Sequence, residues 1–232
     1  MSSPLLNHLR FPSGLTVNTA RQRARKHHKT SHIPYNECLD LEVRKNGLQL
    51  PWSKALEHML AATSQCTSAP PQRMTEKDVN EISCRHPSLA QNGFGVVHFP
   101  WDEGTYKESL ARQREMNHWL VPQCNLALAF ISLLTADDSI NRDLNMASIE
   151  LKHHAEHALK LARPGRANNI PQGAFIMAAL HRGLVIADGP GGFYRGAFFN
   201  IKPAPKILDR SELVQNEIIS QLKRQLVCLG ID

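Results

Sequence analysis

The sequence has few of the features that would place the chain in a membrane or export it. Its longest apolar stretch, Leu126–Leu134, covers nine residues and includes Ser132, whereas a membrane-spanning helix needs about 20. The first fifteen residues contain Asn7, Arg10 and two prolines, where a signal peptide would need an unbroken apolar run. We therefore expect no transmembrane segment and a soluble, cytoplasmic protein.

Cysteine pairs are also lacking. The five cysteines are odd in number, widely separated and never arranged as Cys-x-x-Cys, so neither a disulfide framework nor a thiolate zinc site is indicated. A chain of 232 residues can bury enough apolar surface to fold without such staples. We expect a reducing compartment, no metal and no cofactor.

Motifs of common active sites are absent as well. The chain contains no Gly-x-x-x-x-Gly-Lys-Ser/Thr phosphate loop, and the glycines between Gly189 and Gly196 lack the preceding strand and the following helix that a dinucleotide site requires. No cysteine lies beside a glycine at a strand-to-helix turn, which leaves no candidate nucleophile. We predict no catalytic residues and a non-enzymatic protein.

Two Glu-x-x-His motifs, Glu115–His118 and Glu150–His153, are the most metal-like pattern. Di-iron helical bundles use this spacing because it directs a carboxylate and an imidazole to one interior point. However, Glu150 and His153 fall on the helical face away from Leu151, and the bridging glutamates of such bundles are missing. We expect a solvated helix surface here, with a helical-bundle metalloprotein as an alternative.

Positive charge is concentrated near the N-terminus. The net charge is +6 and the isoelectric point is about 9.2, and most of the excess comes from one run without acidic residues: Arg21, Arg23, Arg25, Lys26 and Lys29. Clustered cations release counterions from a polyanion when they bind it, although no aromatic side chain interleaves this run for base stacking. We predict contact with nucleic acid or an acidic protein partner, with a solvated helix face as the alternative.

Helix signals divide the chain into two units. Residues 14–62 are predicted to form an N-terminal basic module of three helices, with Thr16 or Asn18 as the first cap and Gly47 as a stop. Residues 63–74 are rich in Ser, Thr and Pro and predict a linker. The main helical domain is expected over residues 75–232. The first helix of the module is predicted to follow the Thr16 or Asn18 cap and to run to about His28, and the other two are predicted over residues 35–46 and 52–62.

The main domain is predicted to be helical with a small antiparallel sheet. Thr75 and Asp78 have capping-box spacing, and Pro122 should kink or split a long helix near Leu120. The two long helices should pack as an antiparallel pair, and the fold class is mainly α (α+β). Helices are expected over residues 76–84, 105–135, 139–162, 171–181 and from 210 onwards, a strand over 94–99, and a β-hairpin over 184–201.

The predicted hairpin is aromatic, with Phe193, Tyr194, Phe198 and Phe199. Apolar residues on both of its sides suit a packed sheet or a protein interface better than a wing that lies on DNA. The order of a helix followed by a Gly-rich hairpin is nevertheless that of a winged helix. A DNA-binding regulator that uses the basic helix and this hairpin is therefore an alternative.

The stretch Leu15–Met59 resembles a short helical module found at an end of many plasmid-borne and mobile-element bacterial proteins, through Ala24–Lys26, Cys38–Leu48 and Leu50–Trp52. The remainder is similar in size and character to small plasmid accessory proteins that regulate conjugation, including fertility-inhibition factors. The resemblance implies an accessory protein that inhibits or modulates conjugative transfer. The implied partner is the conjugative coupling ATPase of a co-resident plasmid.

Overall fold

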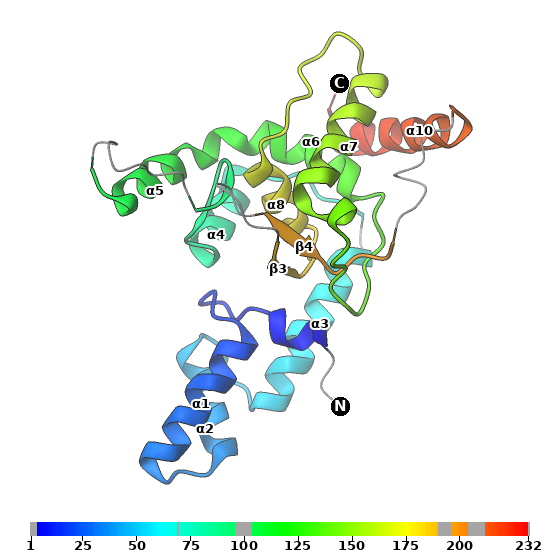
Figure 1. Cartoon of the computed structure of the whole chain (residues 1–232). Helices are drawn as coiled ribbons and strands as arrows, with labels where there is room; N and C mark the ends of the chain where they lie inside the picture. The colour runs from blue at the N-terminus through cyan, green and yellow to red at the C-terminus, as the bar shows by residue number, and fades with distance from the viewer. Residues whose placement is uncertain (1–3, 69, 96–103, 190–195, 204–211, 232) are drawn as a thin grey trace.

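The computed structural model describes residues 4–68, 70–95, 104–189, 196–203 and 212–231. Within them the chain is mainly helical, with two small antiparallel sheets of two strands each, as the predicted fold class requires. Figure 1 shows a narrow N-terminal part below a wider body that contains the later elements. No helix in the described residues is long and apolar enough to cross a membrane.

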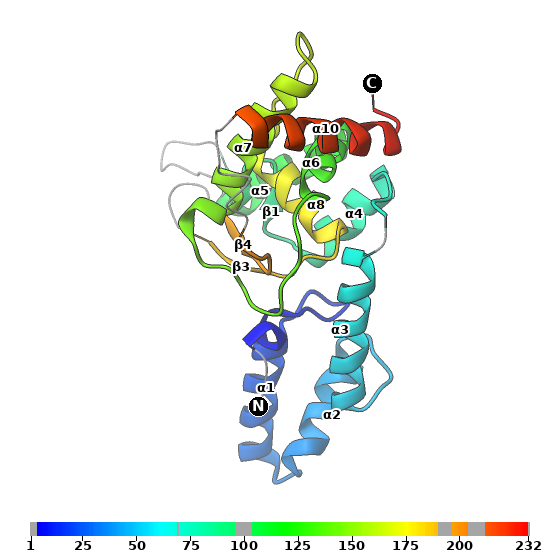
Figure 2. The same ribbon diagram turned by 90° about the vertical axis from the view of Figure 1, so that its right-hand side faces the viewer.

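The narrow part consists of a short 3-10 helix, η1, and three α-helices. The side chain of Thr16 accepts a hydrogen bond from the amide of Thr19 and so caps α1, as predicted, and Pro34 precedes α2. Figure 2 shows α1 and α2 side by side and pointing away from the body. The elements are η1 (Pro4–His8), α1 (Val17–Ser31), α2 (Tyr35–Lys45) and α3 (Trp52–Ser68).

The predicted linker is largely ordered in the structure. Helix α3 continues to Ser68, because Ser and Thr cost little in a helix compared with proline, and Pro70 and Pro71 lie just beyond its end. Met74 is buried, and the side-chain amide of Asn125 donates to its carbonyl (3.0 Å) and accepts from its amide (2.8 Å). The prediction that residues 63–74 leave the helix at once was wrong.

The core of the body is built around α6 and α8, which pack more extensively against each other than any other pair of elements. Both helices are apolar on nearly every side. Phe175 of α8 lies 6.4 Å from the ring of Phe130 on α6 and 6.1 Å from that of Phe199. The helices of the body are α4 (Glu76–Arg85), α5 (Tyr106–Glu115), α6 (Val121–Ile131), α7 (Ser148–Ala162), α8 (Gln172–His181) and α10 (Glu212–Cys228).

The two predicted long helices differ in outcome. The one over residues 105–135 is split near Leu120, as predicted, into α5, a 3-10 helix η2 (Met116–Leu120) and α6, with Pro122 in the first turn of α6. Pro122 is tolerated there because the first turn has no intrahelical partner for its missing N–H. The expected antiparallel pair is replaced by two others, since α6 packs mainly on α8, and α7 mainly on α10.

Residues 139–147 do not extend α7, contrary to prediction. Backbone amides in this stretch donate hydrogen bonds of 2.9–3.0 Å to the side-chain oxygens of nearby residues. The bonds run from Asp138 to Asp137, from Asp143 to Asn141 and from Asn145 to Asp143. Such side-chain bonds compete with helical ones. Only the short 3-10 helix η3 (Leu144–Met146) forms before α7.

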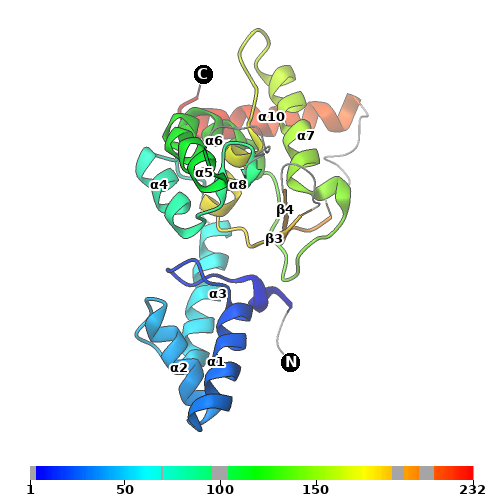
Figure 3. The same cartoon turned by 60° about the vertical axis from the view of Figure 1, so that its left-hand side comes forward.

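The predicted hairpin is present, with shorter strands. β3 (Ile186–Asp188) pairs antiparallel with β4 (Ala197–Phe199), and Ala187 lies opposite Phe198. Figure 3 shows this hairpin beside the lower end of α7. A second sheet joins β1 (Leu89–Ala90) to β2 (Gly93–Phe94). Of the strand predicted over residues 94–99, Phe94 is the last residue of β2. Residues 96–99 lie outside the described part.

Candidate functional site

The outer face of α1 carries four exposed cations: Arg23, Arg25, Lys26 and Lys29. At 100° per residue, these positions fall within about 160° of the helix circumference. The buried residues of α1 occupy the opposite side, at Val17, Ala20 and Ala24. We call these four cations the α1 basic face. The small side chains of Ala20 and Ala24 let this buried side of α1 pack closely on its neighbours, and the four cations point outward on the other side.

Arg21, the fifth residue of the predicted basic cluster, has a different environment. It lies at the edge of the buried side, where its Nη1 donates a 2.6 Å hydrogen bond to Asn7 Oδ1. Its guanidinium carbon is 5.7 Å from the centre of the Trp52 ring. Arg21 therefore connects α1 to η1 and to α3, and the sequence could not reveal this because Asn7 and Trp52 are far from it in the chain.

Helix α2 adds to the same charged surface. A shallow depression of 300 Å³ lies between α1 and α2, and Arg23, Lys26 and Lys45 line it together with Glu42. The Glu42 carboxylate lies 3.9 Å from Lys45 Nζ, and Glu42 is only 5% exposed. Since the acid is covered and the cations are exposed, the accessible surface here is positive.

Charge is divided unequally between the two parts of the chain. Residues 1–68 contain nine Lys and Arg against four Asp and Glu, whereas residues 69–232 contain 18 against 17. The N-terminal part therefore carries +5 of the net charge of +6. Figures 1 and 2 both show α1 and α2 projecting from the body. A large partner can thus reach the α1 basic face without meeting the main domain.

The aromatic hairpin residues lie in the interior as far as the structure describes them. Phe199 is fully buried and packs on Phe175, and Phe198 is 7% exposed, with the Arg142 guanidinium 5.9 Å from its ring centre. Phe193 and Tyr194 lie outside the described residues. Because both described rings are covered by the body, they are unavailable as the predicted protein interface, which leaves the packed-sheet alternative for this pair.

The Glu-x-x-His motifs do not converge. Glu115 ends α5 and His118 lies in the 3-10 helix η2, while Glu150 and His153 are exposed on α7, where His153 Nδ1 lies 3.3 Å from Glu156 Oε2. Across the described ranges, no group of three or more His, Cys, Asp or Glu side chains could hold a metal ion.

The buried thiol of Cys124 is equally unsuited to chemistry. Burial raises its pKa to about 12, so the nucleophilic thiolate is scarce near neutral pH. Its neighbours in α6 are apolar, and the residue packs within the main core. The side chain is therefore part of the packing of the body.

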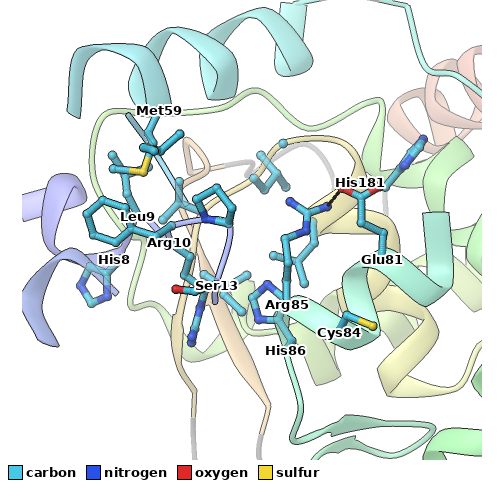
Figure 4. A pocket seen from close by; sticks show the side chains of 18 of the residues that line it. His8, Leu9, Arg10, Ser13, Met59, Glu81, Cys84, Arg85, His86 and His181 are labelled. Atoms are coloured by element: carbon cyan, nitrogen blue, oxygen red, sulfur yellow. Dashed lines mark ion pairs between the residues drawn. The ribbon is translucent and has the colours of Figure 1, made fainter. Parts of the chain in front are cut away.

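A cleft of 710 Å³ separates the N-terminal part from the body (Figure 4). Four stretches of chain that are distant in sequence line it, which is why no sequence motif pointed to it. They are residues 8–13, residues 48 and 58–59, residues 81 and 84–86 of α4 and its end, and residues 180–181 at the end of α8 with residues 183–186 beyond it.

His86, which lines the cleft, is 6% exposed. Burial, together with the smaller effect of the Arg10 and Arg85 charges, lowers its pKa to about 3. Beside it, Arg85 Nη2 lies 3.4 Å from Glu81 Oε1, and at the end of α8 His181 Nε2 lies 3.0 Å from the carbonyl oxygen of Gln72. The cleft therefore presents neutral and positive nitrogen groups beside an apolar lining.

Comparison of the chain with protein-family models, with curated proteins and with solved structures finds no match.

Proposed function

We propose that this protein is a non-enzymatic accessory protein that binds duplex DNA through the α1 basic face. The carrying observation is the set of four exposed cations, Arg23, Arg25, Lys26 and Lys29, on one side of a projecting helix. Clustered cations of this kind gain free energy from counterion release on a polyanion. As part of this proposal, we place the protein in the cytoplasm, as expected from the sequence.

The make-up of the face favours DNA over a protein ligand. A stable protein interface usually has an apolar or aromatic centre that becomes buried, and the outer side of α1 between Gln22 and Lys29 offers charged and polar side chains instead. The aromatic pair of β4 is already covered. Exposed Arg and Lys side chains can bind phosphate groups without an apolar centre.

Fluorescence anisotropy of a short labelled duplex tests the proposal. The full chain should bind with an affinity that falls steeply as salt is raised. A variant with Arg23→Gln, Lys26→Gln and Lys29→Gln should bind about tenfold more weakly or worse, and its dependence of log K on log salt should be shallower by about two to three, since each phosphate contact contributes about 0.9.

A matched variant controls for the loss of charge alone. Lys160, Arg166 and Lys223 are also exposed but lie on the body, and their substitution by Gln removes the same three charges. This variant should keep most of the affinity. Equal losses in both triple variants, or no salt-dependent binding by the wild-type chain, would contradict the proposal.

A protein partner is the second candidate, and one observation favours it. Trp119, in η2, is 65% exposed, with its ring 4.9 Å from that of His118. Large exposed aromatic side chains are frequent anchors of protein interfaces. The resemblance to plasmid accessory proteins makes fertility inhibition, with a conjugative coupling ATPase as target, the form of this candidate.

A conjugation assay separates this second candidate from the first. Expression in a donor cell should lower the transfer of an unrelated co-resident plasmid, and Trp119→Ser should restore transfer while DNA binding is unchanged. Ile149→Ser, at another exposed apolar residue, serves as the matched control. Unchanged transfer at verified expression of the wild-type chain would remove fertility inhibition.

A further inference from the structure

The cleft between the two parts has an apolar wall and a positive end. Leu9, Met59, Leu184 and Ile186 contribute apolar surface, together with the other aliphatic residues of the lining. Glu81 is the one acidic side chain among the described residues that line the cleft, and Arg85 pairs with it. An uncharged apolar ligand would use only the apolar wall and a cation would be repelled at the positive end, whereas an amphiphilic anion could use both parts.

Two buried nitrogen atoms at the positive end lack hydrogen-bond partners. His86 Nδ1 and Arg85 Nε are shielded from solvent, yet neither is bonded to another group of the described structure. A buried polar atom without a partner is unfavourable, and native proteins satisfy most such atoms. Both residues line the cleft, and Figure 4 shows His86 between Arg85 and Arg10.

The charges around His86 make an anion the fitting partner. Arg10 contributes a guanidinium from the N-terminal loop, where its Nη1 donates a 2.7 Å hydrogen bond to the carbonyl of Gly14, and Arg85 contributes one from the end of α4. Two guanidinium groups near one imidazole repel its protonated form and attract negative oxygen atoms. Phosphate and carboxylate oxygens accept such bonds.

We propose that this cleft binds a small organic anion, whose phosphate or carboxylate group contacts Arg85 and His86 and whose apolar body packs against Met59 and Leu184. The site has a volume of 710 Å³, which lies within the range of pockets that hold small molecules. Because its walls come from both parts of the chain, the bound ligand also joins the N-terminal part to the body.

The N-terminal part and the body are also in direct contact next to the cleft, at Gly14 and Arg85. A Cβ atom on Gly14 would come within 2.2 Å of the Arg85 carbonyl oxygen, so the backbones are in direct contact there. Val185 of the body packs into the apolar core of the N-terminal part. A ligand that bridges the same two parts stabilises this arrangement in proportion to its occupancy.

Isothermal titration calorimetry of the full chain with phenyl phosphate and with benzoate tests the proposal, and the two probes distinguish a phosphate site from a carboxylate site. At least one should bind saturably. Phenol and inorganic phosphate, each half of the first probe, should bind about tenfold more weakly or worse, since charge-assisted hydrogen bonds and apolar burial each contribute more than about 1 kcal/mol.

Variants then locate the probe. Arg85→Gln and, separately, His86→Gln should each weaken binding about tenfold or more, whereas Arg166→Gln, at an exposed arginine of the body, should leave it unchanged. The imidazole nitrogen resonances of His86 should also shift on binding, which requires no variant. Absence of saturable binding by both anionic probes, or binding that leaves the His86 resonances in place, would overturn the proposal.

Discussion

The N-terminal part and the body differ in where their side chains are directed. In α1 only Val17, Ala20 and Ala24 are buried and four of the exposed residues are cations, whereas α6 and α8 bury most of their side chains. The net charge is +5 in residues 1–68 and +1 in residues 69–232. The comparison indicates that stability comes chiefly from the body and that the charged surface comes from the N-terminal part.

The largest expected effect comes from the centre of the body. Phe175 is fully buried between Phe130 and Phe199, so Phe175→Ala should lower the free energy of unfolding by about 3–5 kcal/mol. Urea denaturation followed by circular dichroism measures this. Val227→Ala, at a residue that is 77% exposed, should change it by less than about 0.5 kcal/mol. A small effect of Phe175→Ala would contradict the inference that stability comes chiefly from the body.

The contact between the two parts should give the next effect. Gly14 and Gly165 both have positive φ, +84° and +79°, but only Gly14 has a neighbour in the way. Substitution by Ala should cost about 1–2 kcal/mol at Gly165 from backbone strain. At Gly14 the cost should be larger by about 1 kcal/mol or more, because the Arg85 carbonyl must also move. Equal shifts in the thermal unfolding of the two variants would show that this contact is loose.

The stability of the protein should depend on the protonation of His86. Its pKa is about 3 in the folded chain and about 6.5 when unfolded, so the unfolded chain binds the proton more readily between these values. Stability should therefore fall as the pH is lowered from about 6.5 towards 3, by at most about 1.4 kcal/mol per pH unit for this group.

Urea denaturation at pH 7 and at pH 5 checks this dependence. The difference between the two pH values should be smaller in His86→Gln than in the wild-type chain, because the proton-binding group is gone. His157→Gln, at an exposed histidine of α7, should behave as the wild type does. An unchanged difference in His86→Gln would place the pH dependence elsewhere.

The smallest effect separates Arg21 from the α1 basic face. Arg21→Gln loses the bond to Asn7 and the contact with Trp52, so it should lower the free energy of unfolding by about 1 kcal/mol. Arg23→Gln, two residues further along α1 and on its exposed side, should change stability by less than about 0.5 kcal/mol and weaken DNA binding more than Arg21→Gln does. A larger loss of DNA binding in Arg21→Gln than in Arg23→Gln, with no loss of stability, would show that Arg21 belongs to the binding surface.

Local signals predicted the parts of this structure that local chemistry determines. Thr16 caps α1, the Thr75–Asp78 capping box opens α4, and the hairpin forms where strand-like residues flank a glycine-rich turn. The errors occurred where residues had uses that the pattern does not encode. The acidic and amide side chains at 137–143 bond to their own backbone, which ends the apparent periodicity of the helix before Ser148.

Candidate sites were predictable only when they lay within one helix. The α1 basic face is a run of neighbouring residues, so composition revealed it, although not that Arg21 is committed to Asn7. The cleft combines Arg10, Arg85 and His86 with residues after α8, and nothing in their spacing along the chain brings them together. The burial of Phe199 against Phe175 is likewise a property of the packed body.

Hydrogen exchange of the full chain with and without duplex DNA tests the central claim most directly. Amides of α1 (Val17–Ser31) and of the neighbouring end of α2 should become more protected when DNA is added. The paired strands β3 and β4 should exchange as before, because the aromatic side chains of β4 are already covered. Protection confined to the hairpin, with α1 unchanged at saturating DNA, would contradict the assignment of the binding surface to α1.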